Sequence, residues 1–328
     1  MLKKRSVMFA IVGIGLILTI LLAINVGSIS VPLSEMIPGL LKGEGGNIGI
    51  IRDIRLPRIA VALLVGASLS VSGVLLQAVM RNPLADPGIT GISSGASVAA
   101  IIVMLYIPGA IHSLPLFGFL GGLAACALIY SLAWKGGINA IRIVLAGVAV
   151  NAVLGGMSGM LSIINSEKLS GVLMWLNGNI GNKSWEDVGV LFVYTVIGLI
   201  IALPLFKNCN ILALGDKAAT SLGVNVNRQR IIISAVAVFL AGVSTSIAGV
   251  IGFIGLVVPH ISRMIIGSDH KYLIPYSALL GSLVLLVADT CGRIVAKPYE
   301  IPVGIVMAVV GGPFFLYLLR KGDATYGG

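Results

Sequence analysis

Ten apolar runs dominate this chain of 328 residues. A helix needs about 20 apolar residues to cross about 30 Å of hydrocarbon, whereas an outer-membrane strand needs only about 10 alternating ones. Hydrophobic residues make up 57% of the chain and charged residues 10%, which leaves too few polar groups to cover a soluble domain of this length. The sequence therefore predicts an all-α integral membrane protein of about ten transmembrane helices in one domain over residues 1–328.

Charged residues, glycines and prolines bound the predicted spans. The first run follows MLKKRS, but it is too long for a signal-peptide core and has no small-x-small cleavage site, so it is taken as the first helix. The apolar stretch over 231–267 exceeds one span and is interrupted by AGVIGFIG, which predicts a full helix followed by a short one. The spans are 7–26, 59–80, 89–106, 116–134, 143–164, 188–206, 231–251, 253–267, 273–296 and 302–319.

An even number of spans places both termini on the same side of the membrane. With the N-terminus in the cytoplasm, most of the 22 lysines and arginines fall on the inside, as positively charged loops do in membrane proteins. The segment RDIRLPR, residues 52–58, breaks this trend because it brings three arginines to the outer face. Arg293 joins them there. These outer arginines need an explanation beyond orientation.

Five spans precede the middle of the chain and five follow it. If two halves with an odd number of spans repeat, they must have inverted topology, which is typical of transporters with a pathway between the halves. The stretches SGVLLQAVMRNPL and AGVIGFIGLVVPH each combine a glycine-rich helix with a proline break. We therefore predict half-repeats over about 1–165 and 188–320.

Two inside loops carry structure of their own. The segment MRNPLADPGITGISSGAS, residues 80–97, has the prolines and glycines of a shaped turn that lines a cavity. The loop over about 207–230, which contains ALGDKAATSLG, shows the pattern of two short amphipathic helices. A solvated loop has no need of such an apolar face, but a helix that enters a groove in a partner protein does.

Catalytic, metal and proton-relay chemistry is not predicted. Asp289 is the acid within the predicted spans, and it precedes Arg293 by four residues, a spacing that suits an intrahelical pair. The stretch GNIGNKS lacks the glycine that a phosphate loop has before its lysine. The three cysteines are isolated, and the basic residues behind the net charge of +10 are scattered rather than gathered for nucleic acid. If ATP drives transport here, another chain must bind it.

Several long motifs in order resemble the permease subunits of bacterial ABC importers for iron chelates, haem and vitamin B12. They are IRLPR, GASLSVSGVLLQAVMRNPLADPGITGISSGA, LALGDKAATSLG, GFIGLVVPHISR, LLVADTCGR and EIPVGIVMAVVGGPFFLYLL. The resemblance implies a multi-pass protein of the bacterial cytoplasmic membrane that binds no cofactor itself. It also implies a second permease subunit, two ATPase subunits that use ATP and Mg²⁺, and an extracytoplasmic binding protein.

The same resemblance suggests roles for individual residues. Arg55, Arg58 and Arg293 correspond to arginines that meet glutamates of the binding protein. Asn82 and Leu84 of the NPL turn correspond to a cytoplasmic gate, although the chain departs from some members at NAIR, where Ala140 and Ile141 would form its other half. The residues that would couple to the ATPase are Leu214, Gly215, Asp216, Ala218, Ala219 and Leu222.

The sequence thus predicts an importer permease for a metal chelate, with a ferric siderophore ahead of haem and vitamin B12. A stand-alone secondary transporter is the main alternative, disfavoured because intramembrane acids are scarce. A membrane-embedded enzyme is disfavoured because no nucleophile, base or metal cluster can be assembled.

Overall fold

The computed structural model describes residues 2–26, 48–135, 140–165, 169–296 and 299–322. Every regular element in these ranges is a helix, and each predicted span has a helix. Seven of the helices are long and apolar enough to cross a membrane, and three shorter apolar helices complete the set. The ten are α1 (Leu2–Asn25), α4 (Leu56–Met80), α5 (Ile92–Tyr106), α6 (Leu114–Ala133), α7 (Ala140–Ile164), α9 (Trp185–Ala202), α12 (Val226–Ala248), α13 (Ile254–Ile266), α14 (His270–Val295) and α15 (Val303–Gly322).

Shorter elements occupy the connections between these helices. The bounds are α3 (Ile48–Ile50), η1 (Ile51–Arg55), η2 (Pro87–Thr90), η3 (Pro108–Ser113), α8 (Leu169–Leu176), η5 (Leu203–Leu205), α10 (Phe206–Ala213) and α11 (Asp216–Ser221). The predicted division of the long apolar stretch is confirmed. Gly249, at φ +76°, follows the end of α12, and Phe253, at φ +66°, precedes α13. Left-handed backbone at both places ends one helix and redirects the chain before the next.

Helix α4 forms the centre of the bundle and packs against α9, α12, α13 and α14. Two glycines permit the closest of these approaches. A Cβ atom on Gly66 would lie 2.3 Å from the carbonyl oxygen of Gly281, and one on Gly73 would lie 1.8 Å from that of Gly255. Small residues at such crossings let backbones meet where lipid supplies no hydrophobic drive for association.

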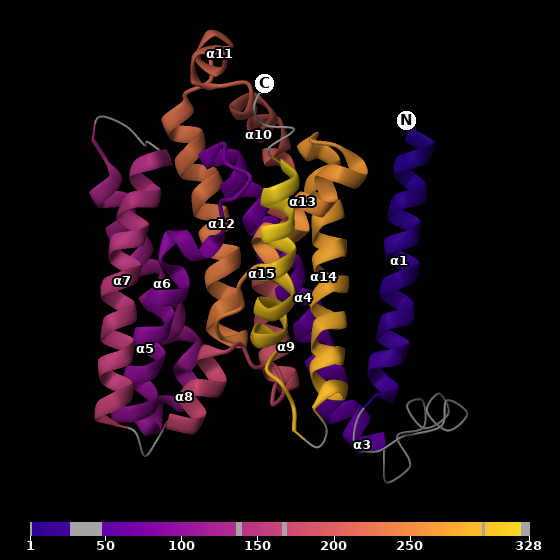
Figure 1. Ribbon diagram of the computed structural model, residues 1–328, viewed down its shortest axis with the longest axis vertical. Coiled ribbons are helices and arrows are strands. Elements are labelled where there is room, and N and C mark those ends of the chain that lie inside the picture. The colour runs from indigo at the N-terminus through magenta and orange to yellow at the C-terminus, as the bar shows by residue number, and fades with distance from the viewer. Residues whose placement is uncertain (1, 27–47, 136–139, 166–168, 297–298, 323–328) are drawn as a thin grey trace.

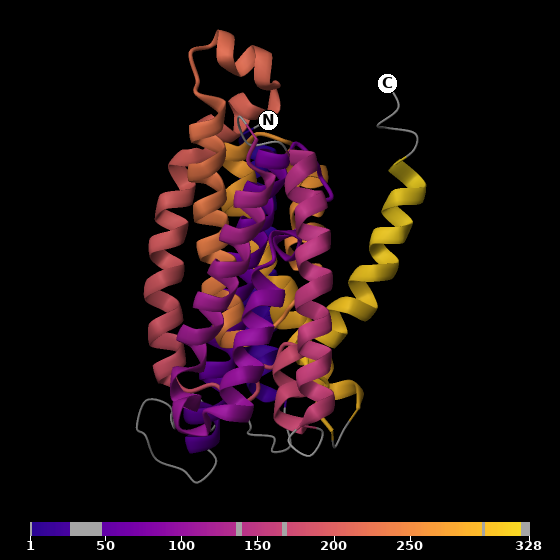
Figure 2. The ribbon, with the colours of Figure 1, turned by 90° about the vertical axis from the view of Figure 1, so that its left-hand side faces the viewer.

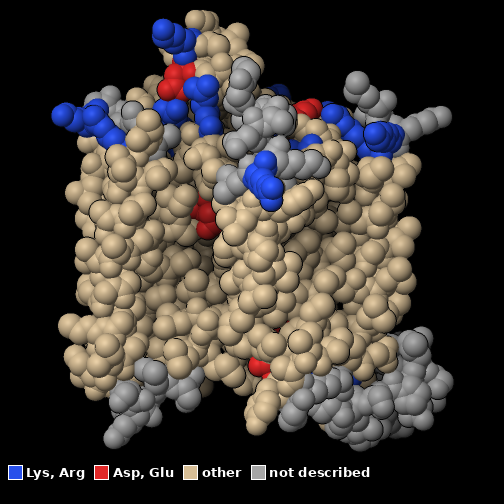
Figure 3. All heavy atoms as spheres, viewed as in Figure 1, with Lys and Arg blue, Asp and Glu red and all other residues tan. Residues whose placement is uncertain are grey.

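The two ends of the bundle differ in charge. Helix α1 begins and α15 ends at the end where α10 and α11 project (Figure 1). Lysine and arginine side chains gather at this same end on the face drawn in Figure 3. The observed arrangement therefore agrees with both termini in the cytoplasm, and η1 and the last turn of α14 lie at the opposite, outer end (Figure 1).

Candidate functional site

Three elements bring the outer arginines together. Arg55 ends η1, Arg58 lies in the first turn of α4 just after Pro57, and Arg293 lies in the last turn of α14. Pro57 lies where the wider turn of η1 continues into α4, and a proline there removes one backbone donor from the helical run. We call Arg55, Arg58 and Arg293, together with Asp289 and Glu300, the outer charge cluster.

Arg58 is held by two carboxylates. Its Nε donates to Asp289 Oδ1 at 3.0 Å and to Oδ2 at 3.1 Å, and its Nη2 donates to Oδ1 at 2.9 Å. Its Nη1 donates to Oε2 of Glu300 at 2.6 Å. A planar guanidinium can bind one carboxylate through two N–H groups and a second carboxylate through a third, a fork geometry that lysine lacks. This one side chain therefore joins α4 to α14 and to the segment before α15.

Arg55 and Arg293 bind the end of the first helix. Arg55 Nη1 donates to the carbonyl of Ile24 at 2.6 Å, and Arg293 Nη1 donates to those of Ala23 at 3.1 Å and Val26 at 3.0 Å. The carbonyls of Ala23 and Ile24 belong to the last turn of α1 and that of Val26 follows it, where helix carbonyls lack intrahelical donors. The cationic side chains also complement the negative end of the helix dipole.

The predicted pair within α14 is confirmed, since Arg293 Nε lies 3.3 Å from Asp289 Oδ2. However, Asp289 also accepts from Arg58 across 231 positions of sequence. Arg55, Arg58 and Arg293 are only 6%, 7% and 5% exposed. In this conformation they hold the outer end together and do not form an open surface. Their role in docking stays a prediction, and it requires the arginines to exchange their present partners.

At the inner end, the predicted gate turn is a compact loop. Arg81, at φ +48°, ends α4, and the carboxamide oxygen of Asn82 accepts from the N–H of Leu84 at 2.9 Å. Buried Gln77 donates to the carbonyls of Ala85 at 3.3 Å and Gly255 at 3.2 Å. The loop is thus fastened to the start of α13, with Leu84 exposed.

The two glycine and proline breaks, far apart in sequence, face each other across a small cavity. This cavity, of about 190 Å³, is lined by Asp86 to Gly88 and by Val250 to Gly252, with Ser93, Ser94 and Thr245 among its polar groups. Asn151 of α7 donates to the carbonyl of Gly88 at 3.0 Å. Irregular backbone is tolerated at such depth where it lines a cavity. The two breaks therefore line one cavity together.

The predicted amphipathic inside loop forms the projecting pair α10 and α11 (Figure 2). Gly215, at φ +102°, makes the turn between them, a conformation that L residues rarely adopt. Leu214 and Leu222 are 64% and 60% exposed, and Ala218 is exposed as well, whereas Ala219 is fully buried. Asp216 accepts from Arg230 Nη2 of α12 at 2.9 Å. The exposed side chains of Leu214 and Leu222 therefore lie on the part of the chain that projects from the bundle.

Some neighbours of the predicted residues carry no sequence signal of their own. Glu300, Gln77 and Arg230 lie in no motif that assigns them a partner, and each contacts a group distant in sequence. Of the gate's other half, Ala140 and Ile141 begin α7, and residues 136–139 lie outside the described residues. In the described part of the chain, no group of three or more His, Cys, Asp or Glu side chains could hold a metal ion.

Comparisons with known proteins bear on these arrangements. The FecCD transport family matches residues 15–321. The Fe(3+)-citrate import system permease protein YfmD of Bacillus subtilis (strain 168) is 41% identical over 321 residues, 98% of this chain and 96% of YfmD. A protein of Staphylococcus aureus (strain Newman), named probable heme-iron transport system permease protein IsdF, is 38% identical over 317 residues, 97% of this chain and 96% of IsdF.

A solved structure, described as an inward-facing conformation of a metal-chelate type ABC transporter, superposes with a TM-score of 0.85 at 30% identity. The match covers 96% of this chain and 99% of the solved chain. The agreement extends over nearly all of both chains, so it includes the helical bundle together with its connections.

Proposed function

Because this chain belongs to the FecCD transport family, we propose that it carries an iron chelate inward, with a ferric siderophore as the expected cargo. The chain is a membrane-spanning ABC transporter permease, a transport subunit rather than an enzyme. It lies in the bacterial cytoplasmic membrane as a multi-pass protein.

An iron cargo is supported by the relatives, whose names specify Fe(3+)-citrate and heme-iron. Both names describe iron that arrives with its own ligands. A bare ferric ion would demand several carboxylate or imidazole ligands from the protein. The described residues offer no such group, which fits a chelate that passes intact. Ferric siderophore is the proposed cargo, with haem and vitamin B12 as the alternatives.

The observation that carries the ABC mechanism is the projecting pair α10 and α11. Leu214 and Leu222 are exposed on the loop of α10 and α11, which projects from the inner end of the bundle (Figure 1), and an exposed apolar side chain in water is costly unless a partner covers it. Each of two ATPase subunits would receive one such loop from one permease subunit. Through Gly215 and the Asp216–Arg230 bond, closure of the ATPases would move α12.

A second permease subunit would cover the side of the bundle that carries α15, opposite α9. Helix α15 diverges from the bundle towards the inner end (Figure 2), and Val309, Val310 and Leu316 on it are exposed. On α7, a Cβ atom at Gly155 or Gly159 would meet nothing within 4 Å. Small residues facing open space in an apolar helix suit close contact with another helix.

An extracytoplasmic binding protein would dock at the outer charge cluster. Arg58 already holds a half-exposed carboxylate, Glu300, at 2.6 Å, so its site is of a kind that accepts a glutamate. Docking would replace internal partners by those of the binding protein. Arginine–glutamate pairs between two proteins mainly determine the orientation and rate of association, and salt weakens them.

The proposal is tested by reconstitution in liposomes with the ATPase and the binding protein. We expect uptake of a ferric siderophore that requires ATP and the binding protein, and weaker uptake of ferric citrate, haem and vitamin B12. Leu222→Asp should abolish uptake, whereas Ser221→Asp, one residue away and also exposed, should retain it. Uptake without ATP would support a secondary transporter instead.

Docking is tested separately, by binding-protein affinity at low and high salt. Arg58→Glu should weaken binding much more than Arg52→Glu, whose exposed side chain lies outside the cluster. Because Arg58 is buried, each variant is first checked for a single folded species by gel filtration. Equal affinities for the two variants would remove Arg58 from the docking surface and leave the importer proposal standing.

A further inference from the structure

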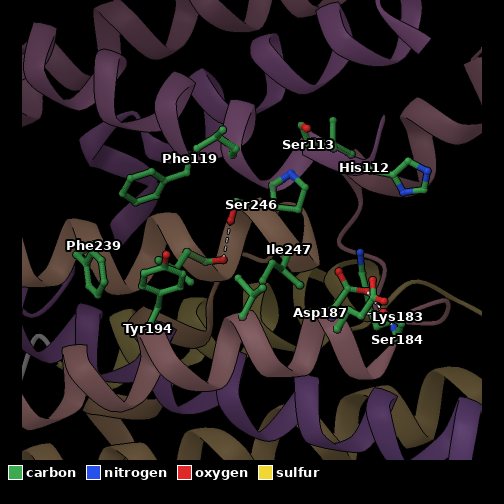
Figure 4. A pocket seen from close by; sticks show the side chains of 16 residues that line it. His112, Ser113, Phe119, Lys183, Ser184, Asp187, Tyr194, Phe239, Ser246 and Ile247 are labelled. Atoms are coloured by element: carbon green, nitrogen blue, oxygen red, sulfur yellow. Dashed lines mark hydrogen bonds between the residues drawn. The ribbon is translucent and has the colours of Figure 1, made fainter. Parts of the chain in front are cut away.

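A cavity of about 670 Å³ lies between α6, α9 and α12. The rings of Phe119, Tyr194 and Phe239 line it, together with Ser246 and Ile247 near the outer end of α12 (Figure 4). Its polar end holds acidic and basic side chains together, so its charge favours no one class of ligand. Because close-packed side chains resist displacement, the cavity leaves the outer half of α12 less confined on this side than a fully packed helix.

Helix α14, in contrast, is bonded to the central helix α4. The hydroxyl of Ser70 donates to the carbonyl oxygen of Ser277 at 2.7 Å, and the hydroxyl of Ser282 donates to that of Leu63 at 2.7 Å. The close backbone approach at Gly66 lies in the same stretch. Sliding α14 along α4 would break these bonds and this fit, and both losses cost free energy. Of the two helices, α14 is therefore the more firmly held.

Helix α10 lies between the inner ends of α12 and α14 (Figure 1). Asn208 and Asn210 of α10 point to roughly opposite sides of it, because successive residues of a helix are rotated by about 100°. The Nδ2 group of Asn208 donates to Oε1 of Gln229 in α12 at 2.7 Å. Asn210 binds the start of α14. The helix that carries the projecting loop is therefore linked by polar groups to both neighbours.

Both ends of the Asn210 carboxamide are bonded. Its Nδ2 donates to Asp269 Oδ1 at 2.9 Å, and its Oδ1 accepts from the backbone N–H of His270 at 3.0 Å and lies 2.7 Å from His270 Nδ1. Asp269 also caps α14, since its side chain accepts from the N–H of Lys271 at 3.0 Å. His270 is only 5% exposed. The link from α10 thus ends in the buried, capped first turn of the helix that is firmly held.

The links to the two neighbours differ in number. Asp216 of α11 accepts from Arg230 Nη2 of α12 at 2.9 Å, which adds to the bond at Asn208. Among the described hydrogen bonds, those that join α10 and α11 to α14 come from Asn210. Loss of the Asn208 bond therefore leaves α12 attached to the pair, whereas loss of the Asn210 bonds frees the pair from α14.

We propose that Asn210 is a positioning residue that fixes α10 to the start of α14, so that movement of α10 and α11 shifts the inner end of α12 relative to α14. The inference rests on the proposed function, in which a partner ATPase moves this pair. With α10 fixed on one side, closure of the ATPases moves α12, whose outer half borders the cavity. Without Asn210, the pair moves while the arrangement of α12 and α14 changes little, and ATP is hydrolysed with little transport.

The test uses the reconstituted importer, with uptake of the ferric siderophore and ATP hydrolysis measured on the same liposomes. Asn210→Ala should lower the amount of cargo taken up per ATP hydrolysed about fivefold, with the rate of ATP hydrolysis retained. Asn208→Ala is the matched control, because it removes the same group two residues away and leaves the bond between Asp216 and Arg230. It should retain most of the native ratio. Equal ratios for the two variants would overturn the role of Asn210.

An exchange of groups keeps the test valid if Asn210→Ala does not purify as a folded species. Asn210→Asp places a second carboxylate against Asp269 and should lower the ratio of cargo to ATP. Adding Asp269→Asn should restore it, because the amide and the carboxylate then exchange places and asparagine caps a helix about as well as aspartate. A double variant no better than Asn210→Asp would contradict the proposal.

Spin labels report the movement directly. They are attached through Arg228→Cys on α12 and Lys271→Cys on α14, both exposed positions, after Cys291→Ser removes the exposed native thiol. Binding of ATP should change the distance between the labels in the native background, and Asn210→Ala should remove most of that change. An unchanged distance in an importer that transports with ATP would overturn this inference alone, whereas uptake without ATP would overturn the proposed function with it.

Discussion

The charge cluster at the outer end allows a prediction of unequal costs for two similar substitutions. Asp289→Asn keeps the shape of a side chain that is 1% exposed, but removes the charge that faces Arg58 and Arg293. Two buried guanidinium groups then lose their shared counter-ion. Removing one partner from a buried ion pair costs about 3–5 kcal/mol of folding free energy, and we expect Asp289→Asn to fall in that range.

Glu300→Gln is the matched control, because it too removes a carboxylate that Arg58 contacts. The side chain of Glu300 is 53% exposed, and an exposed ion pair contributes at most about 1 kcal/mol. Arg58 would keep its bonds to Asp289 in this variant. The two substitutions therefore should differ by about 2 kcal/mol or more in the free energy of unfolding.

The assay is reversible unfolding in mixed micelles with increasing SDS, followed by circular dichroism. Adding Arg58→Met to Asp289→Asn should cost less than the sum of the two single substitutions, because residues in one charge network couple. Equal loss of stability in Asp289→Asn and Glu300→Gln, or strict additivity in the double variant, would refute our account of how the outer end is held.

Three further predictions follow from the described geometry. Gly66→Ala should destabilise the chain by about 1–3 kcal/mol, because its Cβ would meet the Gly281 carbonyl, whereas Gly189→Ala, whose Cβ would meet nothing within 4 Å, should not destabilise it. Gln77→Leu removes two hydrogen bonds from the gate turn and should raise cargo leakage from loaded liposomes in the absence of ATP. Gly215→Ala, at φ +102°, strains the turn between α10 and α11 and should lower the amount of cargo transported per ATP hydrolysed while the chain still purifies as one species.

The helices were predictable because their signals are local. Length and hydropathy identify a span without reference to other spans, and the division between α12 and α13 was indicated by the glycine-rich interruption of the apolar stretch, although the structure places Phe253 as well as Gly249 in left-handed backbone there. The pair α10 and α11 was likewise indicated by apolar spacing on a short helix, and the positions of the outer arginines by the orientation of the chain. The structure has a helix for each predicted span and for both parts of the inside loop.

The inverted repeat of five helices is a prediction of a different kind, since it concerns a symmetry between halves. The two breaks that suggested it do face each other across one cavity. This proximity is compatible with a repeat without establishing one, and the predicted half-repeats stay a prediction. The same holds for the gate role of Asn82 and Leu84.

The sequence alone determined which segments cross the membrane and which acid precedes Arg293 on its own helix, because both depend on residues a few positions apart. The distribution of lysines and arginines among the loops indicated which end faces the cytoplasm. Only the tertiary structure decided that Arg58 pairs with Asp289 across 231 positions, that Arg55 reaches the end of α1, and that an aromatic cavity opens beside α9. A guanidinium can pair with any carboxylate or carbonyl within reach. The packing of helices around α4 selects the partner.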